Sequence, residues 1–572
     1  MINPNIVLLY FFSSLGLILV LNAWRQATIF FFLLLYSLAC AITLGSVVQS
    51  LYPFYVFSLT LATFLVMVFG LKAHCLDMTR GDRWDLFLLG LMYLSFFSFQ
   101  VLEDFLGGQD ERSAYLPMAR LLSQNPNLHT EWFYEALPNF STYVGYPPVL
   151  IGMASLQFNL FGKATEELAA FVPAVFFIGF LMVLLQWSKE EKLSPTVLAG
   201  LIFLSPFFTE KLSWFYFEGP TSFSTTLLIY SLWKFSKNNK DIYLLYAMMG
   251  SSMALMSKYT GCFFTLLLLY YILKWKGLDK KIWGTFFVIH LAPILWYVRN
   301  AYYYGTPIPP FFRFLVSDPQ FRSGLEGLGL LAQETFGGSH KKLVDLAIDF
   351  ISLPFLFLWA AIFPFTVLKK NAVYRGFYTL FCLFLLFWLR ICVDIRYVIP
   401  FYGVVLINLS FLTESLLRKR APAIFNLIPI TRGVMIFALF LSSLCVQYIY
   451  TKYIFPDHIT PALRVMRFLL EQENPKPGTR VFTDTDHILA WRANLVVFQP
   501  VAPSIAADFL TAREQNDFYG LMRKYNIQYI INDPWKSPWE ESIFNSIEND
   551  NQHFKEIYRD VSGVKVWKVV YD

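Results

Sequence analysis

Apolar stretches of about 18 or more residues recur along most of this chain of 572 residues. Each is long enough to cross the hydrocarbon core of a bilayer as a helix. Only 15% of the residues are charged, against about 25% in globular domains. The sequence therefore predicts a polytopic α-helical membrane protein with about 13–14 transmembrane helices.

The apolar runs set the expected helices. The predicted spans are residues 5–22, 28–47, 53–71, 85–102, 166–187, 195–208, 219–234, 241–256, 260–274, 282–298, 346–367, 376–390, 398–416 and 430–449. The first of them has no basic region ahead of it and no small-residue cleavage site, so we interpret it as a span and not as a signal peptide.

Short basic clusters between the runs orient the bundle. They are Lys72/Arg80/Arg83, Lys189/Lys192, Lys234/Lys237/Lys240, Lys274/Lys276/Lys280/Lys281, Lys369/Lys370/Arg375 and Arg418/Lys419/Arg420. The positive-inside rule places all six in the cytoplasm. Residues 103–165, 209–218, 299–345, 391–397 and everything after 450 then lie outside.

This orientation decides how residues 147–161 are interpreted. If this apolar segment crossed the membrane, every later basic cluster would lie outside, and its fifteen residues are short for a crossing. We expect it to lie along the outer interface or to re-enter. The outer loop is then about 60 residues long and holds two helical pieces, at 112–123 and 147–161.

The composition changes after about residue 455. The pattern predicts a helix at 461–472, strands at 480–483 and 495–499, a helix at 507–525, a strand at 527–532 and a hairpin at 554–571. Alternating strands and helices indicate a small α/β domain. We therefore divide the chain into additional N-terminal helices (1–84), a membrane core (85–450) with a long first outer loop, and an extracytoplasmic α/β domain (451–572).

Two adjacent acids, Asp110 and Glu111, stand just beyond a long apolar run and are followed by Arg112 and Tyr115. Charged side chains beside a bilayer are costly, so we take this pair as a candidate functional site. A carboxylate there can act as general base on an acceptor hydroxyl or amine, and the neighbouring arginine favours its ionised form. Ordinary capping of a helix by Asp110 would explain one of the two acids.

Glu218 is a lone acid among aromatic residues, at the expected outer end of a span. Such a carboxylate needs a partner or a function, although an interfacial aromatic belt can also carry an incidental acid. Arg299 and Arg396 lie at the same expected face and suit an anionic headgroup, because a guanidinium binds phosphate through two hydrogen bonds. Snorkelling to ordinary phospholipid is the alternative for both.

Several function classes lack their motifs. The six cysteines have no metal-ligand spacing, and neither His129 nor His340 has a second ligand nearby. No phosphate-binding loop for ATP occurs. The basic residues lie in short clusters between spans, so the net charge of +6 does not indicate nucleic-acid binding. No cofactor is indicated by the sequence, and a divalent metal stays possible.

Six elements in order resemble the GT-C class of integral-membrane glycosyltransferases, in particular the protein O-mannosyltransferase and aminoarabinose-transferase branch. They are Asp110-Glu111-(x)3-Tyr115-(x)3-Ala119-Arg120, Tyr146-Pro147-Pro148, Phe217-Glu218-Gly219-Pro220, Ser257-Lys258-Tyr259-Thr260, Arg299-Asn300 with Gly305-Thr306-Pro307, and Arg396-Tyr397 with Pro400. The likeness covers about residues 85 to 450 and the tail in outline. Tyr146 stands where the aminoarabinose branch has a lysine, and Arg112 lies one residue earlier than the arginine of that branch.

The resemblance implies transfer of a sugar from a polyprenyl-phosphate donor to an acceptor hydroxyl or amine on the extracytoplasmic face, with inversion. It implies that Asp110 is the base and that Glu218 orients the acceptor or the sugar. The candidate catalytic residues are Asp110, Glu111 and Glu218, and the candidate substrate-binding residues are Arg112, Tyr115, Tyr146, Lys258, Arg299, Arg396 and Tyr397.

The expected partners are the lipid-linked donor, membrane lipid and a glycan, lipid or protein acceptor, in a bacterial inner or plasma membrane. Two other functions stay open: a transporter or flippase of a lipid-linked glycan, and a transferase that moves a phosphorylated group. A transporter would favour charges near the bilayer midplane and inverted repeats. We find no repeat, and the acids lie at the rim. A non-catalytic scaffold for the tail domain would leave those acids unexplained.

Overall fold

The structure is a computed structural model of the chain. It describes residues 25–47, 80–102, 114–125, 135–136, 145–308, 372–391, 395–420, 422–449, 459–483, 491, 493–498, 505–532, 541–560 and 563–571. These residues fall into two compact units. The first, the helical unit, takes its residues from 1–107, 147–296 and 340–451, and the second from 108–146, 297–339 and 452–572.

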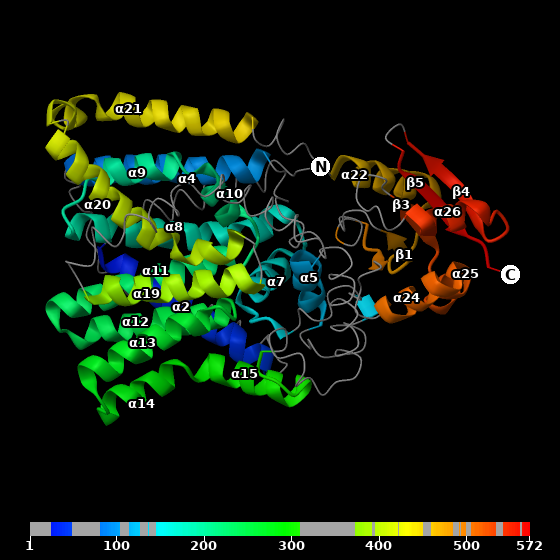
Figure 1. Ribbon diagram of the computed structural model, residues 1–572, viewed down its shortest axis with the longest axis horizontal. Helices are drawn as coiled ribbons and strands as arrows, with labels where there is room; N and C mark the ends of the chain where they lie inside the picture. The colour runs from blue at the N-terminus through cyan, green and yellow to red at the C-terminus, as the bar shows by residue number, and fades with distance from the viewer. Residues whose placement is uncertain are drawn as a thin grey trace. The chain divides into compact units, whose positions relative to one another are not determined.

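The helical unit is a bundle of largely apolar helices (Figure 1). They are α2 (Arg25–Val47), α4 (Arg80–Leu102), α7 (Val149–Phe161), α8 (Glu166–Glu190), α9 (Pro195–Phe203), α10 (Pro206–Ser213), α11 (Glu218–Asn238), α12 (Asp241–Ser257), α13 (Gly261–Lys276), α14 (Lys280–Ile289), α19 (Ala372–Ile391), η4 (Ile395–Phe401), α20 (Tyr402–Arg420) and α21 (Pro422–Ile449). Helix α15 (Leu291–Tyr304) begins in this unit and ends in the second.

Among the described helices, three are long and apolar enough to cross a membrane, namely those at Trp84–Leu102, Glu166–Glu190 and Val398–Lys419. A fourth is counted if α14 and α15, which meet at a bend of 60°, form one broken span. The chain is thus a polytopic helical membrane protein, as predicted. The predicted spans 5–22, 53–71 and 346–367 lie outside the described residues.

Two predicted spans are interrupted. The expected span 195–208 is divided into α9 and α10, because Pro206 has no N–H for the helix ladder and disfavours a helical conformation at Ser205, which adopts φ −123° and ψ 58°. The expected span 282–298 is bent at His290, three residues before Pro293. A hydropathy average does not detect either break, because within each predicted span the residues on both sides of the break are mainly apolar.

The segment predicted at 147–161 is helix α7, which begins after Pro148 and ends at Gly162 in the left-handed conformation (φ 63°). Its 13 residues are too few to cross a bilayer. Most of its side chains are buried, and it packs against α8, α2 and α12. The helix is therefore covered by the bundle over most of its length, and its exposed residues are those at its end, Asn159 to Phe161.

Helices α11 and α12 cross at very short range. A Cβ on Gly250 would lie 2.8 Å from the carbonyl oxygen of Ser224 and 2.9 Å from the backbone nitrogen of Leu228. Real Cβ atoms do not approach backbone atoms so closely, so any larger residue has to move one helix. Glycine is thus required at this crossing.

We expect Gly250→Ala to destabilise the helical unit by about 1–3 kcal/mol, because the added methyl overpacks a backbone contact. Thermal unfolding in detergent micelles measures this. The matched control is Gly284→Ala in α14, where an added Cβ meets nothing within 4 Å. The control should be neutral or slightly stabilising, since alanine favours helix more than glycine does. Equal unfolding temperatures for the two variants would contradict the close crossing.

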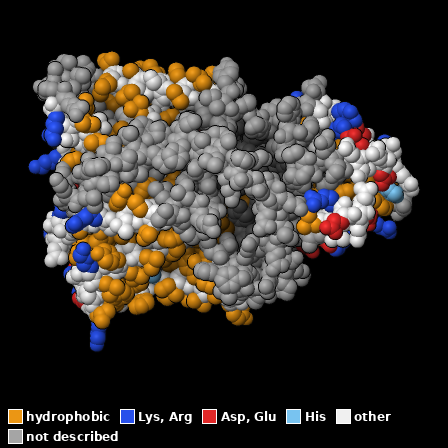
Figure 2. All heavy atoms as spheres, in the orientation of Figure 1, with side chains coloured by type: hydrophobic (Ala, Val, Ile, Leu, Met, Phe, Trp, Pro, Cys, Tyr) orange, Lys and Arg blue, Asp and Glu red, His pale blue; other side chains and the backbone are white. Residues whose placement is uncertain are grey.

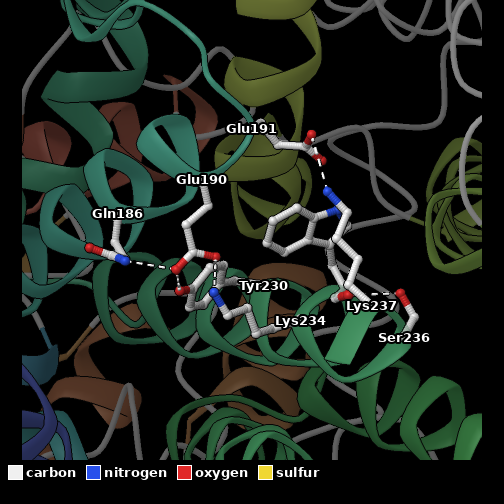
Figure 3. Close-up of polar contacts among 8 residues, drawn as sticks. Gln186, Glu190, Glu191, Tyr230, Lys234, Ser236 and Lys237 are labelled. Atoms are coloured by element: carbon white, nitrogen blue, oxygen red, sulfur yellow. Dashed lines mark hydrogen bonds and ion pairs between the residues drawn. The ribbon is translucent and has the colours of Figure 1, made fainter. Parts of the chain in front are cut away.

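Polar side chains connect the helix ends at one end of the bundle (Figure 3). The carboxylate of Glu190 accepts hydrogen bonds from Gln186 (2.7 Å) and the Tyr230 hydroxyl (3.0 Å), and it pairs with Lys234. Neighbouring ion pairs join Asp85 to Lys189, Glu191 to Lys237 and Asp241 to Lys276. Figure 2 shows the Lys and Arg side chains gathered at this end of the helical unit.

These contacts bear on orientation. The Tyr374 hydroxyl donates to Glu191 (3.5 Å), and the backbone N–H of Ser194 donates to Glu414. Each of the six basic clusters thus has a described residue within or close to this set of contacts. These described residues lie on one side of the bundle, as the positive-inside rule requires. That this side is cytoplasmic stays a prediction.

The tail forms a five-stranded sheet with the order β2-β1-β3-β5-β4. The strands are β1 (Arg480–Thr483), β2 (Val496–Phe498), β3 (Tyr529–Asn532), β4 (Phe554–Arg559) and β5 (Lys565–Val569). Strands β1, β2 and β3 pair in parallel, and β3, β5 and β4 pair antiparallel. The helices are α22 (Ile459–Phe468), which a π-helical turn at Leu469–Glu473 continues, α24 (Ala506–Gln515), α25 (Phe518–Lys524) and α26 (Glu541–Asn549). The α/β prediction for the tail is confirmed.

Two details of the tail differ from the prediction. The single helix expected at 507–525 is two helices, because Asn516 adopts a left-handed conformation (φ 55°) and Asp517 caps α25 by accepting from the N–H of Gly520. Helix α26 is not predicted. Phe544 and Ile547 face the core one turn apart, within a segment whose other residues are mostly polar.

Candidate active site

Glu218 and Lys258 form a buried ion pair. The Lys258 Nζ lies 2.5 Å from a Glu218 carboxylate oxygen, and the side chains are 9% and 3% exposed. Glu218 is in the first turn of α11, and Lys258 directly follows the last residue of α12. Each charge is stabilised by its helix, since negative charge is favoured at an N-terminus and positive charge at a C-terminus.

Antiparallel packing brings this pair together. Helices α11 and α12 are neighbours joined by a short turn, so the beginning of α11 meets the end of α12. The sequence indicated Glu218 and Lys258 as separate candidates, 40 residues apart, without predicting their contact. A buried carboxylate needs such a partner, because isolated burial of a charge is very unfavourable.

The segment around Lys258 is a tight turn between α12 and α13. The N–H of Gly261 donates to the carbonyl of Lys258 (2.9 Å), and a Cβ on Gly261 would lie 2.4 Å from the carbonyl of Ala254. Tyr259 and Thr260 are buried here. The Ser257–Thr260 motif thus fixes the backbone on which the Lys258 ammonium is held.

The Arg396-Tyr397 motif lies on η4, which packs against α11. The Ser222 hydroxyl donates to the carbonyl of Ile399 (3.2 Å), and the Thr225 hydroxyl donates to the carbonyl of Pro400 (2.7 Å). Ser222 is about one turn beyond Glu218 on the same helix. The backbone of η4 is thus fixed close to Glu218. The structure describes the backbone of Arg396 and Tyr397 but not their side chains.

Gln100 ties the end of α4 to the approach to Glu218. Its amide nitrogen donates to the carbonyls of Ala170 (3.1 Å) and Ser213 (2.9 Å), and the side chain is buried. Ser213 lies five residues before Glu218. Helix α4, which leads into residues 103–113, therefore ends at the same end of the bundle at which α11 begins. Asp110, Glu111 and Arg112 themselves lie outside the described residues.

Two more of the predicted motifs meet in the second unit. The side-chain amide of Asn300 is fully buried and donates to the carbonyl of Gly145 (2.8 Å). Arg299 donates to the Asn300 side-chain oxygen (3.0 Å), and its guanidinium lies 5.1 Å from the ring centroid of Tyr303. Gly145 precedes Tyr146, which is half-buried. The Arg299–Asn300 motif thus holds the loop that carries Tyr146.

Helix α5 (Leu116–Gln124) follows the acidic motif and is the helical piece predicted at 112–123, beginning later than expected. Tyr115 is buried at its beginning. Arg120 donates to the carbonyl of Trp491 (2.6 Å) and lies 5.2 Å from the centroid of that ring. Burial lowers the pKa of the Arg120 guanidinium to about 10, which still leaves it charged at neutral pH. The first-loop motif is thereby attached to the tail domain.

Sequence reasoning missed Glu210 and Lys211 on α10. Lys211 lies 3.2 Å from the ring centroid of Trp214 and 3.2 Å from the buried carboxylate of Glu210. Their signal is a charged pair at the end of an apolar run, the same signal that identified Asp110 and Glu111. Gln100 was also missed, although an amide inside an apolar run is unusual.

No metal site is evident in the part of the chain that the structure describes, where no three His, Cys, Asp or Glu side chains gather. The acids of the first loop are not among those residues.

No family model matches the chain, and no curated protein matches its sequence. Among solved structures, the chain is similar to ArnT from Cupriavidus metallidurans, crystallised with undecaprenyl phosphate bound. The match covers 84% of this chain and 97% of ArnT, with a TM-score of 0.54 and 13% identity. The chain has the ArnT fold. The resemblance of the sequence to the GT-C class is thus confirmed at the level of the fold.

Proposed function

We propose that this protein is a membrane glycosyltransferase that moves a sugar from a polyprenyl-phosphate donor to an acceptor hydroxyl or amine. The observation that carries the proposal is the Glu218–Lys258 pair, adjoining η4 and the end of α4 on a fold shared with a protein that binds undecaprenyl phosphate. The ammonium of Lys258 supplies positive charge for a lipid phosphate, while Glu218 fixes that ammonium and orients the acceptor or the sugar.

The proposed chemistry is a single displacement. Asp110 takes the proton of the acceptor as the acceptor oxygen or nitrogen bonds to the anomeric carbon, and the bond from that carbon to the phosphate oxygen breaks. The leaving polyprenyl phosphate is already an anion of low basicity, so it needs positive charge more than a general acid. Arg112, Arg299 and Arg396 are the further candidates to provide that charge. Attack from the face opposite the phosphate inverts the sugar, as in inverting glycosidases.

The proposed sidedness is extracytoplasmic for the site and the tail domain. Two observations support it: the described residues of the basic clusters lie at or beside connected helix ends at one end of the bundle, and Glu218 begins α11 at the other end, away from Lys234 and Lys237. The second compact unit collects its residues from the loops that this orientation expects outside. The lipid-linked donor suits that side, where nucleotide sugars are absent.

The test is consumption of the donor. Purified full-length protein in nanodiscs is incubated with radiolabelled polyprenyl-phosphate sugars and with lipid, glycan and peptide acceptors. Transfer of the label to an acceptor, with release of polyprenyl phosphate, supports the proposal. Passage of intact donor across a proteoliposome membrane without cleavage would instead establish a flippase. Transfer of label from phosphorus rather than from the sugar would establish a transferase of phosphorylated groups.

A further inference from the structure

The bend between α14 and α15 leaves one carbonyl without its place in the helix ladder. The carbonyl of Ile289 would accept from the N–H four residues later, and that residue is Pro293, which has none. The ring of a proline also clashes with this carbonyl, which drives the two helices apart to 60°. A carbonyl left free in a bundle surrounded by lipid must find another donor.

Two hydroxyl groups from other helices supply the hydrogen-bond donors for the Ile289 carbonyl. The Tyr36 hydroxyl of α2 donates to the Ile289 carbonyl (2.5 Å), and so does the Ser252 hydroxyl of α12 (2.9 Å). Tyr36 and Ser252 are more than 200 residues apart in the chain. The bend is thus held from two sides.

The next residue is held as well. The imidazole of His290 is buried, with Nδ1 2.9 Å from the carbonyl of Phe286 and Nε2 3.1 Å from the Ser251 hydroxyl. Since a carbonyl only accepts, Nδ1 carries the proton in neutral His290, and Ser251 donates to Nε2. Ser251 in turn lies 2.8 Å from the Thr265 hydroxyl of α13. Polar contacts from α2 and α12 therefore converge on two consecutive residues at the corner, and α13 contacts one of these donors.

This corner sets the direction of α15, the helix that ends in Arg299 and Asn300. A free proline hinge would sample a range of angles, whereas these contacts select one. We infer that Tyr36 and Ser252, by capping the Ile289 carbonyl, are positioning residues that set the direction of α15 and thereby the placing of Arg299 for an anionic lipid phosphate. The placing of Arg299 for a phosphate rests on the proposed function, whereas the direction of α15 does not.

The bend itself is tested by distance. Spin-labelled noncanonical residues are placed at the exposed positions Lys281 and Tyr302, so that the six native cysteines stay in place. With a rise of 1.5 Å per residue, a bend of 60° gives a backbone separation of about 27 Å, and a straight helix gives about 31 Å. In the Tyr36→Phe/Ser252→Ala variant, we expect the distance distribution from pulsed electron resonance to broaden and shift toward the longer value.

Function is tested with the same double variant. Loss of two hydrogen bonds weakens the preference for the bent form by roughly tenfold to thirtyfold. We expect the Kd for undecaprenyl phosphate, and the KM for the donor if transfer is active, to rise about tenfold. The rate at saturating donor should change much less.

Adding Pro293→Ala separates positioning from stability. Alanine restores an N–H for the Ile289 carbonyl, so the triple variant should regain the unfolding temperature of the natural chain. It should nevertheless stay straight and bind undecaprenyl phosphate weakly, which a purely structural role does not predict.

The matched control is Tyr271→Phe/Ser46→Ala. It also removes two hydroxyls that donate to carbonyls, those of Ala372 and Ile42, away from the bend. The control should keep both the distance and the affinity. An unchanged distance in the Tyr36/Ser252 variant would overturn the inference, and so would a shifted distance with unchanged affinity. Absence of transferase activity in the natural chain would overturn the proposed function. The distance measurement would still test whether Tyr36 and Ser252 set the direction of α15.

Discussion

Lys258→Ala is expected to destabilise the helical unit by about 3–5 kcal/mol, because it leaves the buried carboxylate of Glu218 without a counter-charge. Glu218→Ala should have an effect of similar size through the buried ammonium. The double variant Glu218→Gln/Lys258→Met keeps the volume of both side chains and removes both charges. Since replacing a whole buried pair by neutral groups is often tolerated, the double variant should recover most of the lost stability.

The double variant is also expected to have no measurable transfer activity, because the positive charge for the donor phosphate is gone. Thermal unfolding in nanodiscs and donor turnover are measured side by side. The matched control is Lys276→Ala, which breaks an ion pair to Asp241 whose side chain is 61% exposed. That change should cost less than about 1 kcal/mol, as surface ion pairs do. A stable double variant with full transfer would remove Glu218 and Lys258 from the site.

Asp110→Asn is expected to lower the transfer rate by about 10²–10⁴-fold, the usual contribution of a general base. Asparagine keeps the size of the side chain but cannot take the acceptor proton. Affinity for undecaprenyl phosphate should stay unchanged, because the proposed phosphate contacts come from Lys258 and the arginines. Rapid single-turnover measurements separate the chemical step from binding.

Glu111→Gln is the companion variant, since the sequence offers two adjacent acids. If Asp110 is the base, Glu111→Gln keeps most of the rate, and only Asp110→Asn loses it. Full activity of Asp110→Asn, in membranes where the protein is expressed and inserted, ends the assignment of the base to Asp110. Loss of donor affinity in the same variant would indicate that Asp110 binds the donor and does not transfer the proton.

The sequence predicted the features that depend on local composition. Apolar runs gave most helices of the bundle, and alternating patterns gave the strands of the tail, because burial in lipid or in a core selects apolar side chains along the whole element. The breaks at Ser205 and His290 escaped because one proline changes the backbone without changing the average hydropathy. Helix α26 escaped because most of its residues are polar, and among its described side chains Phe544 and Ile547 are the ones that reach the core.

The sequence named candidate residues one by one but did not predict how they are arranged. Glu218 stood out as a lone acid among aromatic residues, and Lys258 was a candidate through the family resemblance of its motif. Their pairing depends on the close crossing of α11 and α12 at Gly250, which nothing in the two charged motifs indicates. Likewise, the contact of Asn300 with Gly145 joins segments 155 residues apart. Such contacts follow from tertiary packing, which a pattern along the chain does not contain.

The hairpin of α12 and α13 has 17 and 16 residues in its two arms, so each arm is only about 25 Å long. A typical bilayer has a hydrocarbon layer of about 30 Å. Leu266 and Tyr270 on α13 are exposed at the surface of the bundle. If this surface faces lipid, its apolar height is less than the thickness of the hydrocarbon layer beside it. Because both arms are predicted spans, we expect the lipid leaflets to thin beside this hairpin, and reconstitution into lipids of graded chain length should favour the shorter ones. The Lys258 turn lies at the tip of this hairpin. A difference between the length of the hairpin and the thickness of the membrane would therefore act on the segment that holds the Lys258 ammonium.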